Sequence, residues 1–522
     1  MSTQLDQYTE YLLLSPVDNV VVALRELRRG HRIDVDGKSI EVQDQIPPGH
    51  KVAIQAISAD KPVKKFGWAI GLATQSIAPG QHVHSHNLRC DHVIDLEAIS
   101  TEIPDDPPAL TNNTFEGFVR PTGKVGTRNY VAIISNVNCS ASVARMIAQR
   151  FDNDYLQQYF PNVDGVVAFK HDGGCAMAFG GIRHQMLTQV LGGIAKHPNI
   201  GGFLLVGLGC EQGTLGHLID SQKLHQIQMP ANGNGASRAL PVLSIQDQGG
   251  TRKTVQAGVE LVAQLLPQVN QAKRTTVSAS HLILGTECGG SDGYSGITAN
   301  PALGAAADRI VACGGTAILS ETPEIYGAEH LLTRRARSRA VAEKLLERID
   351  WWKQYCRIFD EELDSNPSVG NKAGGLTTIT EKSLGAVAKG GTTALEAVYE
   401  YAHPVTAKGF VVMDSPGFDP ASVTGLMAGG ANLIAFTTGR GSCFGSKPVP
   451  CLKIASNSNL YHRMREDMDI NAGQAIEGRS VDAVGEEIFQ TLLRVASGEK
   501  TLSEQLNLGD DEFVPWTVGP VL

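Results

Sequence analysis

The hydrophobic pattern of the chain changes character near residue 92. Up to that point, short apolar runs of the β type alternate with turns rich in glycine and proline. The clearest runs are NVVVAL, KSIEV, KVAIQAI and WAIGLATQSI, and the turns include IPPGHK and IAPGQH. This pattern predicts a small all-β domain over residues 1–92. Residues 93–114 are acidic and rich in proline, a composition typical of an extended linker.

From residue 115 the apolar runs become more continuous, and helical stretches alternate with them. The runs are YVAIISNV, DGVVAFKH, GGFLLVGLG, PVLSI, HLILGTE, TAILSET, GFVVMDSP, LIAFTTG and CLKIAS. The helical stretches include ASVARMIAQRF and an amphipathic segment near residues 484–497. Strands of this kind between helices are typical of a parallel sheet covered on both faces. The sequence therefore predicts a large α/β region with a Rossmann-like parallel sheet.

The pattern is interrupted near residues 335–375. A long charged stretch, RRARSRAVAEKLLERIDWWKQYCRIFDEEL, predicts one or two helices, and DSNPSVGNKAGGL after it predicts a glycine-rich loop. We place a boundary here between a first lobe, residues 115–375, and a second lobe, residues 376–522. The alternative is an insertion within one continuous region.

Composition and charge exclude several classes of protein. The net charge is −9, and no run of lysine or arginine forms a stripe that could follow a phosphate backbone, so a nucleic acid is not expected as a partner. No window approaches 18 uninterrupted apolar residues, and the first residues lack the basic and apolar regions of a secretory signal. We therefore expect a cytoplasmic protein with no membrane partner. The nine cysteines lack C-x-x-C spacing and are expected to be reduced thiols.

Several predicted strands end in residues that can carry chemistry. In open parallel sheets ligands bind beyond the carboxyl ends of the strands. Four of the predicted strands are followed there by cysteine and polar neighbours, which either line a site or fill the core. The residues in question are Cys139, His171, Cys175, Cys210, Glu287, Cys288 and Asp292.

Groups that can bind an anion follow other predicted strands. Glu321 follows TAILS, while Arg440 leaves the strand LIAFTTG. Arginine holds a carboxylate through two parallel hydrogen bonds, and lysine offers a point charge. With these we group Asn371, Lys372, Thr438 and Lys447 as candidate ligands of a polyhydroxylated acid. The alternative for Gly-Arg-Gly is a surface turn with a solvated arginine.

The segment QHVHSHN in the predicted β domain carries three alternating histidines. If the segment is extended, His82, His84 and His86 share one face. Imidazoles in this arrangement are good ligands for a divalent metal. A loop conformation would break the arrangement, and the histidines would then be structural.

An ordered set of motifs covers nearly the whole chain. They are GHKVAI, KFGWAIG, GQHVHSHN, GFVRPTGKVGTRNY, HDGGCA, GLGCE, ECGGSDGYSGITANPA, LSETPEIYGAEHLLTRRA, NPSVGNKAGGLTTITEKSLG, MDSPG, FTTGRG and DMDINAG. In this set the sequence resembles the altronate/galactarate dehydratase family. The resemblance implies an N-terminal SAF-type domain of the β-clip kind, a homodimer, and dependence on Fe2+, with Mn2+ or another divalent ion as alternatives.

The resemblance also implies the reaction, in which water is eliminated from D-altronate to give 2-keto-3-deoxy-D-gluconate. Galactarate or a related acid, sulfolactate cleavage, and a non-catalytic sugar-acid sensor are the alternatives. An iron–sulfur hydro-lyase is a further one, because cysteines crowd the inferred site.

We assign roles to the candidate residues on this basis. The metal ligands are expected to be His84, His86 and Cys288, and the acid and base are expected among His171, Glu287, Asp292 and Glu321. Arg440 and Lys372 would hold the substrate, together with Asn371, Thr438 and Lys447. Residues expected to line the site are His82, Cys139, Cys175 and Cys210.

Overall fold

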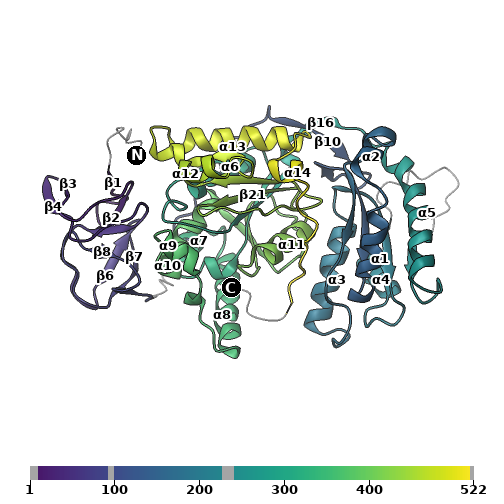
Figure 1. The fold of residues 1–522 in the computed structure, drawn as a ribbon, viewed down its shortest axis with the longest axis horizontal. Coiled ribbons are helices and arrows are strands. Elements are labelled where there is room, and N and C mark those ends of the chain that lie inside the picture. Colours follow the sequence, from purple (N-terminus) through teal and green to yellow (C-terminus); the bar gives the residue numbers. More distant parts are fainter. Residues whose placement is uncertain (1–9, 92–98, 226–239, 518–522) are drawn as a thin grey trace.

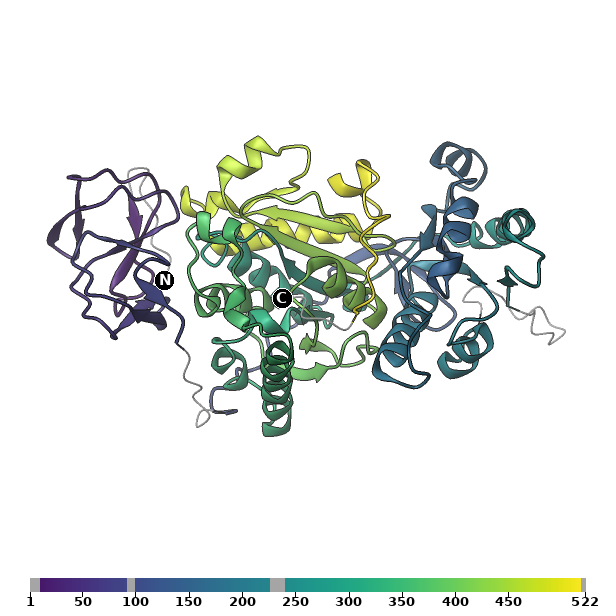
Figure 2. The ribbon, with the colours of Figure 1, turned by 60° about the horizontal axis from the view of Figure 1, so that its bottom comes forward.

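In the computed structural model, which describes residues 10–91, 99–225 and 240–517, the chain folds into three parts arranged in a row. The N-terminal β domain occupies one end, and a four-stranded parallel sheet with its helices occupies the other (Figure 1). A seven-stranded parallel sheet lies between them, and the same order is visible after rotation (Figure 2). The middle part is therefore the last in sequence, and it separates the first two.

The N-terminal part is built only from strands, which pair antiparallel into three small sheets, as the apolar runs and turns predicted. Its side chains alternate: in β3, Ile33 and Val35 are buried while their neighbours are exposed. The strands are β1 (Tyr11–Leu12), β2 (Val20–Ala23), β3 (Arg32–Val35), β4 (Lys38–Glu41), β5 (Lys51–Ala53), β6 (Pro62–Lys65), β7 (Trp68–Ala73), β8 (His82–Val83) and β9 (Leu88–Arg89).

The four-stranded sheet has the order β13-β12-β14-β15, and all its strands are parallel. Alternate residues of β12 enter different cores: Val131 and Ile133 pack with α1 and α5, while Ala132 and Ile134 pack on the side of α3. The strands are β12 (Tyr130–Ser135), β13 (Gly165–Phe169), β14 (Ile200–Gly207) and β15 (Val242–Ser244). The helices are α1 (Asn138–Ala148), α2 (Asn153–Tyr159), α3 (Ile182–Ala195), α4 (Leu215–Gln222) and α5 (Thr251–Val269).

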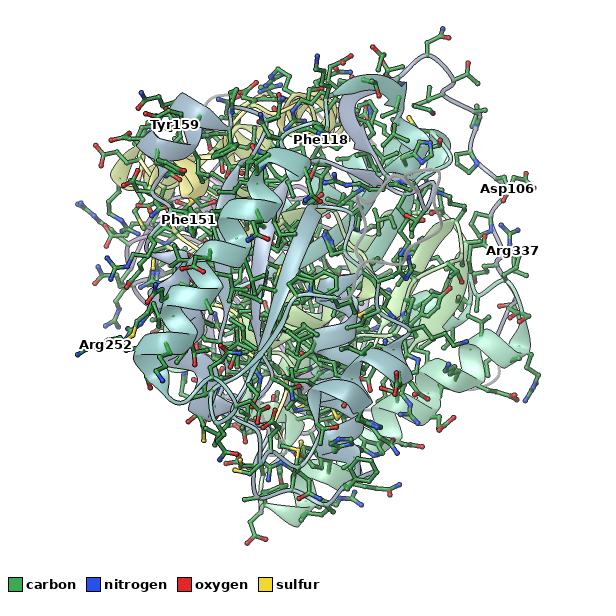
Figure 3. All side chains as sticks on the ribbon, turned by 90° about the vertical axis from the view of Figure 1, so that its right-hand side faces the viewer. Asp106, Phe118, Phe151, Tyr159, Arg252 and Arg337 are labelled. Atoms are coloured by element: carbon green, nitrogen blue, oxygen red, sulfur yellow. The ribbon has the colours of Figure 1, made fainter. Side chains whose placement is uncertain are left out.

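A small antiparallel sheet and the linker tie the parts together. The sheet has the order β11-β10-β16, formed by β10 (Thr114–Val119), β11 (Val125–Gly126) and β16 (Thr275–Ser278). Residues 99–113 have neither helix nor strand and run over the seven-stranded region, where Asp106 pairs with Arg337 at 2.6 Å (Figure 3). Residues 93–98 of the predicted linker lie outside the described residues.

The seven-stranded sheet has the order β19-β20-β18-β17-β21-β22-β23, and its strands are also parallel. The strands are β17 (Ile283–Cys288), β18 (Thr316–Leu319), β19 (Leu395–Tyr399), β20 (Gly409–Met413), β21 (Leu433–Thr438), β22 (Cys451–Ala455) and β23 (Ile470–Asn471). The helices are α6 (Ala299–Ala312), α7 (His330–Thr333), α8 (Arg339–Ile358), α9 (Val369–Ala373), α10 (Ile379–Ala386), α11 (Asp419–Gly429), α12 (Ser458–Arg463), α13 (Val481–Ala496) and α14 (Leu502–Gln505). The chain is thus a mixed α/β protein with an all-β N-terminal part.

Each of the nine long apolar runs contains a strand, but the boundary expected at residue 375 falls inside the seven-stranded sheet. β17 and β18 precede that residue, and the other five strands follow it. The two parallel sheets divide instead between α5 and β17. The charged stretch forms the single helix α8, and the expected glycine-rich loop contains α9, capped by Ser368. No helix of the described residues is long and apolar enough to cross a membrane.

Candidate active site

The β domain is joined to the seven-stranded region along a line of very close backbone contacts. The carbonyl oxygen of Gly49 lies very close to Gly293 and Gly375. A Cβ added to Gly293 would be 2.1 Å from this oxygen, and a Cβ added to Gly375 would be 2.3 Å from it. Tyr294 also donates its hydroxyl to Ala23 O at 3.2 Å. The loops that follow β17 and α9 therefore meet the β domain where only glycine fits.

We expect Gly293→Ala to push the β domain away from this line of contact. The added methyl group overlaps a backbone oxygen that cannot rotate aside, and overpacking of this kind costs about 1–3 kcal/mol. Faster proteolytic release of the β domain and lower activity are the expected results. Gly370→Ala is the matched control, because its nearest neighbour would be Ser368 Oγ at 3.8 Å. Equal proteolysis rates for both variants would contradict the expectation.

A cluster of histidines lies at this junction. His50 Nδ1 is 3.0 Å from His82 Nε2, and the rings of His82 and His84 stack at 5.3 Å between centroids. The ring of His86 lies 5.6 Å from that of His82. The strand β8 ends at Val83 and His84 begins a turn, so the expected extended segment is shorter than predicted. The three alternating histidines are nevertheless neighbours, and His50 joins them.

Two carbonyls from the α9 segment fix the tautomers of this cluster. A carbonyl oxygen only accepts, so His84 donates its Nε2–H to Lys372 O at 2.9 Å and His50 donates its Nε2–H to Ala373 O at 3.3 Å. His50 Nδ1 then accepts from His82 Nε2–H. This leaves the Nδ1 lone pairs of His82 and His84 available, with the Ser85 hydroxyl 3.0 Å from the latter.

Burial keeps these imidazoles neutral. Burial is the largest cause, and together with the smaller effect of neighbouring histidines it lowers the pKa of His82 to about 3 and that of His50 to about 4. Burial also lowers the pKa of His84. Neutral imidazoles with free lone pairs can bind a metal ion or take a proton at neutral pH.

Loops from three strand ends of the seven-stranded sheet approach the same junction. The backbone N–H of Arg440, after β21, donates to Gly290 O at 2.8 Å, after β17. A Cβ on Gly374 would lie 3.0 Å from Asp292 Cβ and 3.2 Å from Arg440 Cδ. Among the described residues the exposed guanidinium of Arg440 has no hydrogen-bond or ion-pair partner. It is therefore available to an anion.

Asn371 connects two of these loops, and Thr438 closes the turn that carries Arg440. Asn371 Nδ2 donates to Ser291 O at 2.8 Å, and Thr438 Oγ1 accepts from Gly441 N at 3.1 Å. The structure therefore brings together, in one place, these predicted residues: His82, His84, His86, Asp292, Asn371, Lys372, Thr438 and Arg440.

Asp292 belongs to this group of loops, but its carboxylate is fully engaged. It accepts from Ser456 Oγ at 2.8 Å, from Asn457 Nδ2 at 3.0 Å and from Ser295 Oγ at 2.9 Å. Burial raises the pKa of Asp292, and the hydrogen bonds from Ser456 and Ser295 oppose that change. The carboxylate therefore joins the ends of β17 and β22, a positioning role rather than that of a free base.

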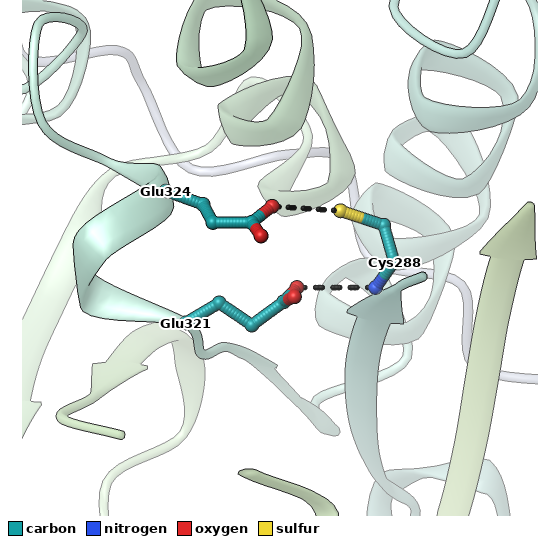
Figure 4. Close-up of side chains that lie close together, drawn as sticks. All are labelled: Cys288, Glu321 and Glu324. Atoms are coloured by element: carbon teal, nitrogen blue, oxygen red, sulfur yellow. Dashed lines mark hydrogen bonds between the residues drawn. The ribbon is translucent and has the colours of Figure 1, made fainter. Parts of the chain in front are cut away.

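A second group of ionisable residues is buried, except that Asp419 is half-buried. Cys288 donates its backbone N–H to Glu321 at 3.1 Å and its thiol to Glu324 at 3.4 Å (Figure 4). Lys389 contacts both Cys288 Sγ at 2.7 Å and Glu321 at 2.6 Å, and Lys382 pairs with Glu324 at 2.5 Å. These residues form an acid–thiol cluster, which we define as Glu287, Cys288, Glu321, Glu324, Lys382, Lys389 and Asp419.

The carboxylates of the acid–thiol cluster differ in charge. Burial, followed by the charge of Glu321, raises the pKa of Glu287 far above its usual value, while burial also raises that of Glu321. Burial would raise the pKa of Glu324 too, but Lys382 and Lys389 outweigh it and lower the value. A proton in this cluster is therefore held by Glu287 in preference to Glu324.

The acid–thiol cluster also contains candidate metal-binding groups. The ligand atoms of Cys288, Glu321 and Glu324 lie within 4.8 Å of one another, as do those of Glu287, Glu321 and Asp419. One oxygen each of Glu287 and Glu321 is buried without a hydrogen-bond partner. Such oxygens fit a cation or a shared proton.

The remaining predicted residues lie elsewhere. His171 is buried in the four-stranded part, where its Nε2–H is donated to Ser135 O at 2.9 Å. Cys139, Cys175 and Cys210 belong to the same part. Lys447 pairs with Asp510 at 2.8 Å. Cys288 points into the acid–thiol cluster and not toward the histidines. The structure therefore places these residues apart from His84: His171, Cys139, Cys175 and Cys210 are in the four-stranded part, and Cys288 is in the acid–thiol cluster.

Sequence reasoning missed His50, Glu324, Lys382, Lys389 and Asp419. His50 follows Gly49 in the turn IPPGHK. That glycine was the one feature of the sequence that could have indicated a close contact next to His50. Lys382 and Lys389 lie on α10 and the short turn after it, in a segment without apolar alternation. No local pattern indicates that they pair with residues 58 and 68 positions away.

Comparison with known protein families shows which family this chain belongs to. Residues 9–91 match the altronate/galactarate dehydratase SAF domain, residues 117–270 match the second domain of D-galactarate dehydratase/altronate hydrolase, and residues 279–521 match the C-terminal domain of D-galactarate/altronate dehydratase. The chain belongs to the altronate/galactarate dehydratase family.

Three curated relatives match this family member over nearly its whole length. It is 36% identical to the altronate dehydratase of Bacillus subtilis over 94% of this chain and 95% of that one. It is 35% identical to the altronate dehydratase of Escherichia coli, over 95% and 97%, and 35% identical to the galactarate dehydratase of the same organism, over 95% of both. The predicted family is therefore confirmed.

Proposed function

We propose that this protein is a sugar-acid dehydratase that converts D-altronate to 2-keto-3-deoxy-D-gluconate. The observation that carries the proposal is the junction of the β domain with the strand ends. Neutral imidazoles lie there against one side of the α9 segment. Arg440, which has no side-chain partner among the described residues, lies close to Gly374 at the end of that segment. The sequence identity of 36% and 35% to two altronate dehydratases, which extends over nearly the whole chain, supports the reaction and the substrate. Galactarate is the alternative substrate, because a galactarate dehydratase is nearly as similar.

The substrate carboxylate would be held by Arg440 and Lys372. The guanidinium offers two parallel N–H donors to a carboxylate, and the Lys372 ammonium adds a point charge on the neighbouring loop. Asn371 and Thr438 hold these loops in place through the contacts with Ser291 and Gly441. In this binding mode C2 and C3 of the acid would lie beside the histidines.

The histidine cluster fits a divalent ion, which we propose to be Fe2+. The Nδ1 lone pairs of His82 and His84 would hold it, because both rings are neutral and both Nε2–H groups are already bound. When bound, the ion supplies Lewis-acid stabilisation of the negative charge that develops on the substrate carboxylate. The group formed by Glu287, Glu321 and Asp419 is the competing location.

His86 is the group that we propose takes the proton. It is the exposed member of the cluster, 5.6 Å from His82, and histidine is the side chain most often used as a general base. His86 removes the C2 proton, the C3–O bond breaks, and the imidazolium returns a proton to the departing hydroxyl, which leaves as water. The resulting enol becomes the 2-keto-3-deoxy acid.

A direct assay tests the function. The purified protein is given ferrous iron and a reductant without oxygen, and is then tested with altronate, galactarate and other aldonates and aldarates. We expect a 2-keto-3-deoxy product from altronate that disappears on chelation and returns with iron. Formation of product from galactarate alone would change the substrate, and no product from any acid with metal bound would refute the proposal.

We expect Arg440→Ala to raise KM for altronate about 10- to 100-fold, with a smaller effect on kcat. Charge-assisted hydrogen bonds of this kind contribute about 1.5–3 kcal/mol. Arg440→Lys keeps the charge and is expected to recover part of the loss. Arg339→Ala, which removes an exposed arginine paired with Glu343, is the control. An unchanged KM in Arg440→Ala would remove Arg440 from the site.

Metal binding should persist at lower pH than is usual for histidine ligands. A free histidine is protonated below a pKa of about 6.5, whereas the pKa of the proposed ligand His82 is about 3 and burial lowers the pKa of the other ligand, His84. Protons therefore compete with the ion only well below pH 6. Titration of iron binding between pH 7 and pH 4.5 checks this, and a midpoint near 6.5 would contradict it.

The remaining assignments are proposals of the same kind. We propose that the protein is a cytoplasmic homodimer and that the fold of its two parallel sheets is Rossmann-like. Size measurement by light scattering tests the dimer. The residues named above lie within one chain, so a monomeric enzyme with full activity would remove only this part of the proposal.

A further inference from the structure

A cavity of about 800 Å³ lies between the two α/β parts of the molecule. One wall comes from α3 and α4 of the four-stranded part, and the other comes from α8 and the C-terminal segment that carries Trp516. α3 belongs to the end part and α8 to the middle part (Figure 1). Small-molecule sites have volumes of about 300–1,000 Å³ and are frequent between domains. The size and position of this cavity therefore suit a small molecule.

Direct contacts between the two parts hold the cavity in its shape. α3 packs on α11 so closely that a Cβ on Gly193 would lie 2.4 Å from Ala428 O. Gln189, which lines the cavity, donates Nε2–H to Ala402 O at 3.2 Å. The two walls are therefore fixed relative to each other, and the cavity is already formed in the absence of a ligand.

Aromatic rings are present on both walls. On the four-stranded side, the ring of Phe179 lies 4.7 Å from the ring of His184. On the opposite side, Trp351 stacks on Tyr355 at 4.6 Å and lies 5.7 Å from Trp516 in an edge-on arrangement. Aromatic side chains prefer stacked or edge-to-face contacts with another ring. The walls therefore suit a flat aromatic molecule.

Large apolar side chains of the lining are exposed to solvent. The exposed fraction is 56% for Phe179, 60% for Ile182 and 73% for Ile358. Exposed apolar side chains that gather around a cavity are typical of a ligand-binding groove. A ligand that covers them would remove this apolar surface from water.

The charged side chains of the lining already have partners. Arg348 pairs with Glu347 at 2.5 Å, and Glu400 lies 3.6 Å from His403. The buried carboxylate of Asp414 accepts an indole N–H at 2.8 Å. A charged ligand would bring a further charge that these pairs do not balance, and an unpaired charge removed from water is unfavourable. The cavity therefore favours an uncharged ligand.

Two hydrogen-bond donors of the lining are unused. Among the described residues, Arg348 Nε and Trp516 Nε1 are buried without a hydrogen-bond partner. Buried donors without an acceptor are rare in folded proteins. A ligand with an acceptor oxygen would satisfy one of them.

We propose that this cavity binds an uncharged, flat aromatic molecule that carries a carbonyl oxygen. Its ring lies between Phe179 and Trp351, and its oxygen accepts a hydrogen bond from Arg348 or Trp516. The lining shares no residue with the histidine cluster or with the acid–thiol cluster. The proposal therefore does not depend on the proposed dehydration.

Coumarin is the probe, because it is an uncharged two-ring molecule with one carbonyl oxygen. The full-length protein is titrated with coumarin by isothermal calorimetry and by tryptophan fluorescence. Trp351 and Trp516 line the cavity and Trp352 stacks on Trp516 at 5.0 Å, so three of the four tryptophans report binding. We expect saturable binding at one site per chain with quenching of the fluorescence. Naphthalene, without the oxygen, and coumarin-3-carboxylate, with an added charge, are expected to bind more weakly.

Two variants test the two contacts separately. Phe179→Ala is expected to weaken coumarin and naphthalene alike, by about 3- to 10-fold, because both lose the stacking contact. Arg348→Met keeps the length of the side chain and is expected to weaken coumarin about 10-fold while leaving naphthalene unchanged. Tyr159→Ala is the matched control, because Tyr159 is an aromatic residue of the same part that is also 56% exposed.

Four results would overturn the proposal. They are the absence of saturable coumarin binding, equal coumarin affinity in wild type and both variants, displacement of coumarin by altronate, and binding of D-glucose in place of coumarin. Displacement by altronate would place the probe in the dehydratase site, and glucose binding would make this a sugar site. Phe179 is exposed, so its variant is expected to keep the wild-type melting temperature, and a thermal unfolding curve checks this.

Discussion

Replacing His84 by alanine is expected to lower kcat/KM about 1000-fold and to remove the response to added iron. Stabilisation of developing charge by a metal ion is worth several kcal/mol, and each 1.36 kcal/mol is tenfold in rate. His84 lies where the β domain meets the α9 segment, with its Nε2–H bound to Lys372 O. Its Nδ1 accepts from the Ser85 hydroxyl, a contact that a bound ion would replace. The variant therefore loses a ligand and a contact that orients it.

Metal content and kinetics separate the two candidate metal locations. Bound iron is measured in wild type, His84→Ala and Glu321→Gln. If the histidines hold the ion, His84→Ala loses iron while Glu321→Gln keeps it. The opposite result would place the ion in the acid–thiol cluster and refute our assignment. His403→Ala is the control, because His403 is exposed and its side chain pairs with Glu400 at 3.6 Å.

The strands could be predicted from sequence because their signal is local. Runs such as GGFLLVGLG are continuously apolar, and β14 is buried at every position. The ends of β17 and β21 could be predicted for the same reason, and Asp292 and Arg440, which follow them, lie close together. The sequence could not show which strands share a sheet, so Cys139 and Arg440 were assigned to one site although they lie on different sheets.

Other errors have the same origin in long-range contacts. The loop predicted around Asn371 is rich in glycine, yet Ser368 caps it into α9, and the Ala373 carbonyl then meets His50 across the domain junction. The domain boundary at residue 375 was predicted because the alternation of strands and helices is interrupted just before it. The structure divides the two sheets near residue 275 instead, where β16 pairs with β10 far earlier in the chain.

Replacing Glu381 by alanine is expected to destabilise the docked β domain by about 3–5 kcal/mol, the usual result of removing one partner of a buried ion pair. Glu381 is fully buried and accepts from Lys51 at 2.9 Å and from Lys65 at 2.8 Å, both of which come from the β domain. Without the carboxylate, two buried ammonium groups face each other. Undocking removes the histidines from the strand ends, so activity should fall with it.

A triple variant separates the charge effect from the loss of packing. Lys51→Met, Lys65→Met and Glu381→Leu together replace the three ions by apolar side chains of similar volume, a change that is often neutral or stabilising. We expect its β domain to resist proteolysis better than that of Glu381→Ala. Glu400→Ala, at an exposed acid, is the surface control. A Glu381→Ala protein as stable as wild type would contradict the role of these charges in docking.

The same ion group predicts how docking depends on pH. Burial alone would raise the pKa of Glu381, but the charges of Lys51 and Lys65 outweigh it and hold the pKa far below its usual value. The stability that Glu381 contributes is therefore complete above the unfolded-state pKa of about 4.3 and is lost as the pH falls below it. Thermal unfolding between pH 7 and pH 3 should show a steeper loss for wild type than for the triple variant. Parallel pH profiles for the two proteins would mean that another group controls the acid sensitivity.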